Sequence, residues 1–234
     1  MATSGHTIKA FDEDLAELRA LVAEMGGLAE AAIDEAVKAL LRRDLESAAR
    51  LVEEDRRIDA MEADLERRAV RLIALRAPLA DDLREVLAAL KIAGVIERIG
   101  DYAKNIAKRV PLLQEVRDID PMAILPAMAD AVSEMVHDVL DAYAARDAHA
   151  AIEVCRRDRR VDDLYNSLFR ALLTYMMENP SNIGASTHLL FVAKNLERMG
   201  DHATNAAEMI YFAATGEQIT ERPRGTDPFA VGEG

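Results

Sequence analysis

The stretch ERIGDYAKN at residues 97–105 returns as ERMGDHATN at residues 197–205. Glu, Arg, Gly, Asp, Ala and Asn recur in the same order, and the two copies begin 197 − 97 = 100 residues apart. Charged residues usually vary freely on a solvated helix face. Either an internal duplication left an echo without meaning, or both halves of the chain perform the same chemistry.

A second repeat extends the first. Residues 36–59, AVKALLRRDLESAARLVEEDRRID, align without gaps to residues 139–162, VLDAYAARDAHAAIEVCRRDRRVD, an offset of 139 − 36 = 103. Repeats of this size indicate copies of one structural unit. We therefore predict an all-α protein of two similar three-helix bundles, residues 1–112 and 113–214. A proline-rich junction at 111–126 separates them, and we expect the Gly- and Pro-rich tail, 215–234, to be disordered.

Composition supports helices and restricts the ligands. Hydrophobic residues make up 50% of the 234 residues but aromatic residues only 4%, with no Trp, which is typical of long helices. The formal charge of −13 argues against nucleic acid as the main ligand and gives no general attraction to anionic lipid. Cations or basic protein surfaces suit such a chain better.

The sequence also predicts the cellular location of the chain. A single cysteine, Cys155, allows no intrachain disulfide and fits a reducing compartment. No apolar run approaches the ~20 residues that a membrane-spanning helix needs. The N-terminus lacks a basic region followed by an apolar one, so we expect no signal peptide. We predict a cytoplasmic protein that is not an integral membrane protein.

Prolines and caps predict the helix boundaries of the first half. Apolar residues spaced by three and four, beginning Ile8, Phe11, Leu15 and Leu18, predict a packed helix from Ile8 to Arg43. Asp44 is typical of an N-cap, and we expect a second helix from there to Leu75. A third is predicted after Pro78, over residues 81–110.

Four acids of the first half should lie at the same height along the predicted bundle. A short turn makes the second and third helices antiparallel. Asp59 and Asp55 precede Pro78 by 19 and 23 residues, and Glu97 and Asp101 follow it by the same 19 and 23. At ~1.5 Å rise per residue, both pairs lie ~28–35 Å from the turn. The second half repeats the arrangement around Pro180 with Asp158, Asp162, Glu197 and Asp201.

Such a cluster is unfavourable without compensation. Two carboxylates ~6 Å apart repel each other by ~3 kcal/mol at an effective dielectric of ~20, and by less in water. Protonation, neighbouring arginines or a bound cation would relieve this repulsion. The arginines beside the acids in sequence turn mostly to other helix faces, so a cation is the favoured remedy. Carboxylate oxygens suit Mg²⁺, Mn²⁺, Ca²⁺ or Fe³⁺, whereas structural zinc prefers Cys or His.

Other residues of the motifs have simpler interpretations. Gly100 and Gly200 lie within predicted helices, where they permit either a tight helix crossing or the approach of bulky ligand atoms. His202 stands where the first copy has Tyr102, so we regard it as accessory. Glu134 and His137 have the Glu-x-x-His form of di-iron bundles, but such sites need two copies, and only one occurs.

The doubled ERxGDxAxN motif, with DRRxD on the preceding helix, resembles the PhoU family of phosphate-transport regulators. THLLFVAKNLERMGDHATNAAEMI (187–210) is similar to the family's C-terminal signature, and residues 77–107 to its N-terminal counterpart. The resemblance covers about residues 8–214. It implies two pseudo-symmetric three-helix bundles whose Glu/Asp-x-x-x-Asp pairs bind multinuclear metal clusters on the surface. Divalent or trivalent ions of iron, manganese, magnesium or zinc are the candidates. The implied metal ligands are Asp55, Asp59, Glu97, Asp101, Asp158, Asp162, Glu197 and Asp201.

The resemblance further implies a role in phosphate homeostasis. PhoU-like proteins restrain phosphate uptake and silence the phosphate-starvation response when phosphate is plentiful. The implied partners are the phosphate ABC transporter ATPase and the phosphate-sensing histidine kinase at the inner membrane, and a homodimer is expected. We therefore predict a non-catalytic, metal-binding negative regulator. A metalloenzyme with a carboxylate-bridged metal site and a purely structural bundle are the alternatives that the residues leave open.

Overall fold

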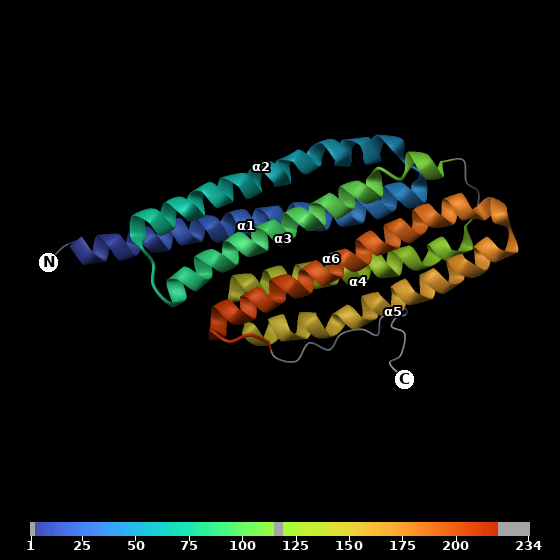
Figure 1. Cartoon of the computed structure of the whole chain (residues 1–234). Helices are drawn as coiled ribbons and strands as arrows, with labels where there is room; N and C mark the ends of the chain where they lie inside the picture. Colours follow the sequence, from blue (N-terminus) through green and yellow to red (C-terminus); the bar gives the residue numbers. More distant parts are fainter. Residues whose placement is uncertain (1–2, 115–118, 220–234) are drawn as a thin grey trace.

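The computed structural model describes residues 3–114 and 119–219, with side chains from residue 10 onward. This part of the chain forms six long α-helices in two sets of three (Figure 1). The first set is α1 (Thr3–Arg42), α2 (Leu45–Arg76) and α3 (Asp81–Ala107). The second set is α4 (Leu125–Ala145), α5 (Ala148–Glu178) and α6 (Ile183–Thr215). Short 3-10 turns cover Pro111–Leu113, Asp120–Ile124 and Pro180–Asn182.

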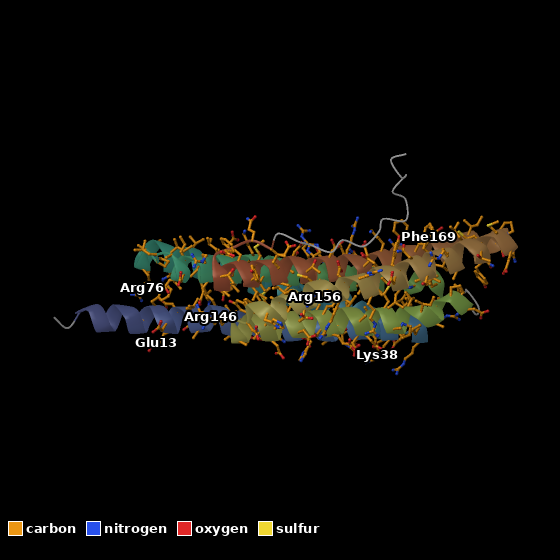
Figure 2. All side chains as sticks on the ribbon, turned by 90° about the horizontal axis from the view of Figure 1, so that it is seen from below. Glu13, Lys38, Arg76, Arg146, Arg156 and Phe169 are labelled. Carbon is orange, nitrogen blue, oxygen red and sulfur yellow. The ribbon has the colours of Figure 1, made fainter. Side chains whose placement is uncertain are left out.

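The helices lie in two layers. Seen from below, α1 and α4 form one layer (Figure 2), and across the other layer the order is α2, α3, α6, α5 (Figure 1). Each lobe is a bundle in which all three helices touch, and the lobes join through contacts of α3 with α6 and of α1 with α4. The predicted all-α fold with two three-helix bundles is confirmed.

The apolar stripe of α1 is buried as its spacing predicts. Leu15 is 6% exposed, Leu18 1%, and Val22 and Met25 0%. One face of α1 therefore supplies the centre of the first lobe, and the period of three and four residues is what places these side chains on that face.

The connection between the first and second helices, which we call the corner, has the same structure in both lobes. Asp44 accepts hydrogen bonds from the backbone N–H groups of Glu46 and Ser47, each at 3.0 Å. Asp147 accepts the equivalent bonds from residues 149 and 150 at 2.9 and 3.0 Å. The preceding arginines, Arg43 and Arg146, have φ of 57° and 56°. The gapless alignment of these two stretches thus reflects one repeated structural corner, and the predicted N-cap is confirmed.

The other helix boundaries lie within a few residues of the prediction. α1 begins at Thr3 rather than Ile8, and α2 extends to Arg76 rather than Leu75. α3 ends at Ala107 rather than at residue 110, because 3-10 turns precede and include Pro111. Residues 220–234, most of the tail expected to be disordered, lie outside the described residues. No helix in the described ranges is both long and apolar enough to cross a membrane.

Candidate functional site

The four acids of the first lobe meet between α2 and α3, around a lysine. The ammonium of Lys104 donates hydrogen bonds to Asp55 Oδ2 and Asp101 Oδ1, each at 2.5 Å. Asp55 is 6% exposed, deep between the helices, whereas Asp59 one turn later on α2 is exposed. Asp59 and Glu97 are close enough for each to feel the charge of Asp101. We call Asp55, Asp59, Glu97 and Asp101 the first acid cluster.

The proton affinities of the first acid cluster reflect this crowding. Burial raises the pKa of Asp59, and the charges of Asp55 and Asp101 raise it further against the opposing charge of Lys104. Burial likewise raises the pKa of Glu97, and Asp101 adds to the shift. Burial on its own lowers the pKa of Lys104, but the hydrogen bonds to Asp101 and Asp55 outweigh it and leave that pKa raised. The lysine is therefore held charged between the carboxylates.

The second lobe brings its four acids together between α5 and α6. Burial raises the pKa of Glu197, and the charges of Asp201 and Asp162 raise it further, although Lys194 opposes them. Lys194 donates a hydrogen bond to Glu197 Oε1 at 2.6 Å. The other carboxylate oxygen, Oε2, is buried without a hydrogen-bond partner. We call Asp158, Asp162, Glu197 and Asp201 the second acid cluster.

The two motif glycines let the helices cross closely enough to form the clusters. A Cβ on Gly100 would lie 3.0 Å from Ile58 Cδ1 and 3.3 Å from Asp55 Oδ1. A Cβ on Gly200 would lie 3.2 Å from Asp158 Oδ1. Of the two interpretations of these glycines, the tight helix crossing is the one that the structure supports. The crossing brings Asp55 in the first lobe and Asp158 in the second close to the glycine of the facing helix.

Comparison with known proteins gives this arrangement a family. The sequence profile of the PhoU domain matches residues 22–110 and 125–210, one match for each lobe. The chain belongs to the PhoU family. The two acid clusters thus lie one in each of the two PhoU domains.

Individual PhoU proteins are similar along nearly the whole chain. The phosphate-specific transport system accessory protein PhoU homolog of Zymomonas mobilis is 61% identical over 226 residues, covering 97% of this chain and 95% of that protein. A homolog of the same name from Caulobacter vibrioides is 51% identical, covering 94% of this chain and 96% of its own. The crystal structure of PhoU from Pseudomonas aeruginosa is 36% identical with a TM-score of 0.85, covering 88% of this chain and 100% of that one.

A further solved structure shows the same fold. The phosphate transport system regulatory protein PhoU from Streptococcus pneumoniae is 29% identical with a TM-score of 0.83, covering 89% of this chain and 99% of its own. The fold is thus shared with relatives that differ at most positions of the sequence.

The carboxylate oxygens of the clusters are suitable ligands for a hard cation, but they are not arranged as a complete set of metal ligands. Carboxylate oxygens are the ligands that such ions prefer, and Glu197 Oε2 is a buried oxygen that still needs a partner. Across residues 3–114 and 119–219, no three His, Cys, Asp or Glu side chains are arranged to hold one ion. Cation binding would require the carboxylates to turn about their side-chain bonds. The metal-ligand role of the eight acids stays a prediction.

Two lysines complete the clusters, and sequence reasoning missed both. Lys104 follows Asp101 by three residues and Lys194 precedes Glu197 by three, so each shares a helix face with its acid. That spacing was the available signal. Arg98, the motif arginine, is a weaker partner, since its side chain is 61% exposed and lies 3.6 Å from Glu97 and 4.0 Å from Asp101.

The acid clusters are only partly open to solvent. Asp59 is exposed, but Asp55 is buried and the side chain of Glu197 is only 14% exposed. Each cluster therefore runs from the protein surface into the groove between two helices.

The motif residues Tyr102 and His202 connect the two lobes. The Tyr102 hydroxyl lies 3.3 Å from His202 Nε2, and their ring centroids are 5.5 Å apart. Burial lowers the pKa of His202, although neighbouring Asp201 raises it. Tyr102 and His202 thus form an aromatic contact between α3 and α6, and the accessory role of His202 stays a prediction.

The Glu-x-x-His match on α4 lies on the protein surface, where the side chains of Glu134 and His137 are 56% and 61% exposed. His137 approaches Glu30 at 3.4 Å and Asp141 at 3.6 Å. Glu134 instead approaches Arg160, with 3.4 Å between the charged atoms. The two residues of the match therefore have different partners. Cys155 is 6% exposed and packs in the core, as its small apolar character predicts.

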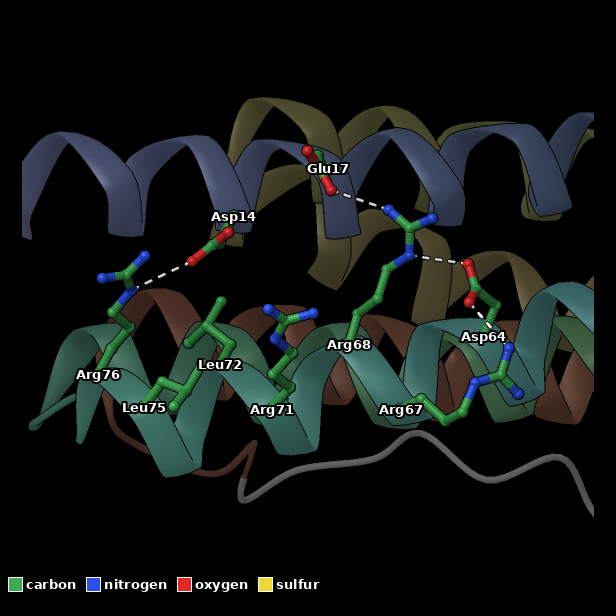
Figure 3. A pocket seen from close by; sticks show the side chains of 9 residues that line it. All are labelled: Asp14, Glu17, Asp64, Arg67, Arg68, Arg71, Leu72, Leu75 and Arg76. Carbon is green, nitrogen blue, oxygen red and sulfur yellow. Dashed lines mark hydrogen bonds and ion pairs between the residues drawn. The ribbon is translucent and has the colours of Figure 1, made fainter.

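A separate cleft of about 520 Å³ lies between α1 and the end of α2 (Figure 3). Its arginines mostly pair with acids inside the cleft. Arg76 meets Asp14 at 3.2 Å, and Arg68 meets Glu17 at 2.8 Å and Asp64 at 2.7 Å. None of the eight acids of the clusters lines this cleft.

Proposed function

We propose that this chain is a cytoplasmic negative regulator of phosphate uptake and of the phosphate-starvation response. It would act as a non-catalytic adaptor between the phosphate ABC transporter ATPase and the phosphate-sensing histidine kinase. Membership of the PhoU family over both lobes carries this proposal. The proteins that resemble the chain along nearly its full length are named as accessory proteins of the phosphate-specific transport system.

Metal binding is the second part of the proposal. The acid clusters would hold iron, manganese, magnesium or zinc, and the buried, unpartnered Oε2 of Glu197 supports a role for the second cluster. A hard cation would supply positive charge that offsets the mutual repulsion of the carboxylates. The residues that would hold it are the four acids of each cluster. Elemental analysis of untagged protein purified without chelator tests this part directly.

A homodimer attached to the inner membrane through its partners completes the proposal. The transporter is a membrane protein complex, whereas the helices of this chain within the described residues offer no span of their own. The attachment is therefore expected to depend on the transporter. Fractionation of cells with and without the transporter genes would test it, and membrane association that survives their removal would contradict it.

Deletion of the gene tests the regulatory role. In phosphate-rich medium the deletion strain should show high alkaline phosphatase activity, and the wild-type gene should restore repression. Unchanged repression in the deletion strain would reject the role. Restoration by Asp55→Asn with Asp158→Asn would separate the regulatory role from the clusters.

The matched control for that experiment is Asp34→Asn with Glu30→Gln. Asp34 is an exposed acid whose only described ion pair is with Lys38 on its own helix. Glu30 lies one turn earlier on α1, so the control removes two negative charges outside both clusters. We expect the control gene to restore repression fully. Turnover of a phosphate ester by the metal-loaded protein, lost in Glu97→Ala, would instead favour a metalloenzyme.

A further inference from the structure

The cleft between α1 and the C-terminal end of α2 is built from parts that the second lobe does not repeat. The two PhoU-domain matches begin at residues 22 and 125, an offset of 125 − 22 = 103. α1 begins at Thr3, about five helical turns before the first match, whereas α4 begins with the second match at Leu125. Asp14 and Glu17, which form the α1 wall of the cleft, therefore lie on an extension that precedes the PhoU-domain match.

The α2 wall of the cleft is rich in arginine. Residues 67–76 contain four arginines, and all four line the cleft. At the offset of 103, one of them has an arginine at the equivalent position of the second lobe, and the other three are replaced by Ala171, Thr174 and Asn179. A helix C-terminus favours basic side chains in its last turn, but only Arg76 lies in that turn. The helix dipole therefore accounts for one arginine of the four.

Arg71 is the arginine of the cleft that the chain itself does not use. Arg67, Arg68 and Arg76 each form an ion pair with an acid that lines the cleft. Arg71 is exposed, and it forms no ion pair or hydrogen bond with any residue that the structure describes. Its side chain rises from α2 between those of Arg68 and Arg76 (Figure 3). The five N–H donors of its guanidinium are therefore available to a group from outside the chain.

An exposed apolar surface adjoins Arg71. Leu75, one helical turn later, lines the cleft and is 65% exposed, and Leu79 just beyond the end of α2 is 80% exposed. Such side chains gain free energy when another apolar surface covers them. Neither water nor a small hydrophilic ligand provides that cover.

We propose that this cleft binds an acidic, leucine-bearing segment of a partner protein, with a carboxylate of the segment on Arg71 and an apolar side chain on Leu75. A carboxylate matches the planar fork of a guanidinium through two parallel hydrogen bonds. Because the chain as a whole has a formal charge of −13, most of its surface repels an acidic segment, and the arginines direct the segment to the cleft. The inference rests on the proposed adaptor role, which requires protein partners, and assigns a surface to one of them.

A free polyvalent anion fits the same cleft less well. Asp14 and Glu17 line the opposite wall and repel such an anion, and the anion leaves Leu75 uncovered. A protein segment instead brings single carboxylates to Arg71 and turns other side chains towards the acids of α1. The mixed charge of the cleft and its exposed leucine therefore favour a protein segment.

Fluorescence anisotropy of a labelled peptide tests the proposal on the full-length protein. The probe is an acidic peptide whose glutamates and leucines recur at spacings of three and four residues. Two companion peptides replace its glutamates by glutamine or its leucines by alanine. We expect the probe to bind and each companion to bind at least about tenfold more weakly. Added NaCl should weaken the binding of the probe, because salt screens exposed charges.

Variants of the protein place the probe in the cleft. Arg71→Ala should weaken binding at least about tenfold, because it removes a charge-assisted pair, and Leu75→Ala should weaken it several-fold. Both side chains are exposed, so both variants should melt at the temperature of the wild type. Arg170→Ala is the matched control, since Arg170 is an exposed arginine of α5 with no described ion pair. We expect it to bind the probe like the wild type.

Three results would overturn the inference: no binding of the probe, equal binding by Arg71→Ala and Arg170→Ala, or equal binding of the peptide without leucines. Pyrophosphate that binds the wild type but not Arg71→Ala in calorimetry, while the probe does not bind, would identify a small-anion site instead. Derepression in the deletion strain together with no probe binding would reject the inference alone. Unchanged repression in that strain would reject the adaptor role, whatever the probe does.

Discussion

At the level of a single residue, Glu197 is a carboxylate whose ionised form is disfavoured by burial and by neighbouring negative charges. Its side chain is 14% exposed, one oxygen accepts from Lys194, and the other has no hydrogen-bond partner. Burial raises its pKa, and the nearby charges of Asp201 and Asp162 add to the shift. In the folded state without metal, the ionised form is therefore penalised.

Glu197→Gln should stabilise the metal-free protein at about pH 7. The folded-state pKa of Glu197 lies above its unfolded value, so the penalty is absent below the unfolded pKa of ~4.3 and complete above the folded pKa. The gain should therefore fade as the pH falls to about 4. Urea unfolding at both pH values measures it, with the exposed Glu178→Gln as control. A variant less stable than the wild type at neutral pH would show that the Lys194 bond dominates instead.

At the level of the helix, α3 contains two glycines with opposite surroundings. A Cβ on Gly94 would meet no atom within 4 Å, whereas one on Gly100 would come within 3.0 Å of Ile58 and 3.3 Å of Asp55. Both are in the middle of the same helix, where glycine costs ~1 kcal/mol relative to alanine. They differ only in whether another helix crosses there.

Gly94→Ala should raise the free energy of unfolding by up to ~1 kcal/mol, because it gains helix propensity at no steric cost. Gly100→Ala should gain nothing or lose stability, since its methyl group must push α2 away. Chemical denaturation of both variants gives the comparison directly. If both variants gained the same free energy of unfolding, α2 and α3 could separate at little cost, and Gly100 would not be needed for their close approach.

At the level of the whole chain, Glu85 ties the two lobes together. It is 7% exposed and forms ion pairs with Arg19 of α1 and with Arg146. Arg146 is the positive-φ residue of the α4–α5 corner, so its ion pair with Glu85 of α3 joins the two lobes. One acid thus links the two lobes by ion pairs, in addition to the packing of α3 against α6 and of α1 against α4.

Glu85→Ala should lower the free energy of unfolding by ~1–3 kcal/mol, the range for hydrogen bonds to charged groups. The lower half of the range is expected because the side chains of Arg19 and Arg146 are 34% and 54% exposed and can be hydrated. Asp81→Ala is the control, since Asp81 is 76% exposed and pairs within its own helix. A Glu85→Ala effect as small as that of Asp81→Ala would show that the lobes are held by apolar packing alone.

Local rules account for what could be predicted. The N-caps Asp44 and Asp147 depend on neighbours within a few residues. The helix order follows from the prolines, and the height of the acids along the bundle follows from the constant rise of a helix. Counting from Pro78 therefore placed Asp55 and Asp101 at one level, where the structure has them joined by Lys104. Helix ends shifted by a few residues because the last turns tighten or fray.

The sequence by itself determined that the chain forms two repeated all-helical lobes and on which side of each lobe the acids lie. It could do so because helical periodicity and internal repeats are visible in the order of residues along the chain. Only the tertiary structure decided which charges meet. Lys104 turns inward to Asp55, Tyr102 meets His202, and Glu85 receives Arg146 from the other lobe. Long side chains have several rotamers of similar energy, so their partners are chosen by helices distant in sequence that pack beside them.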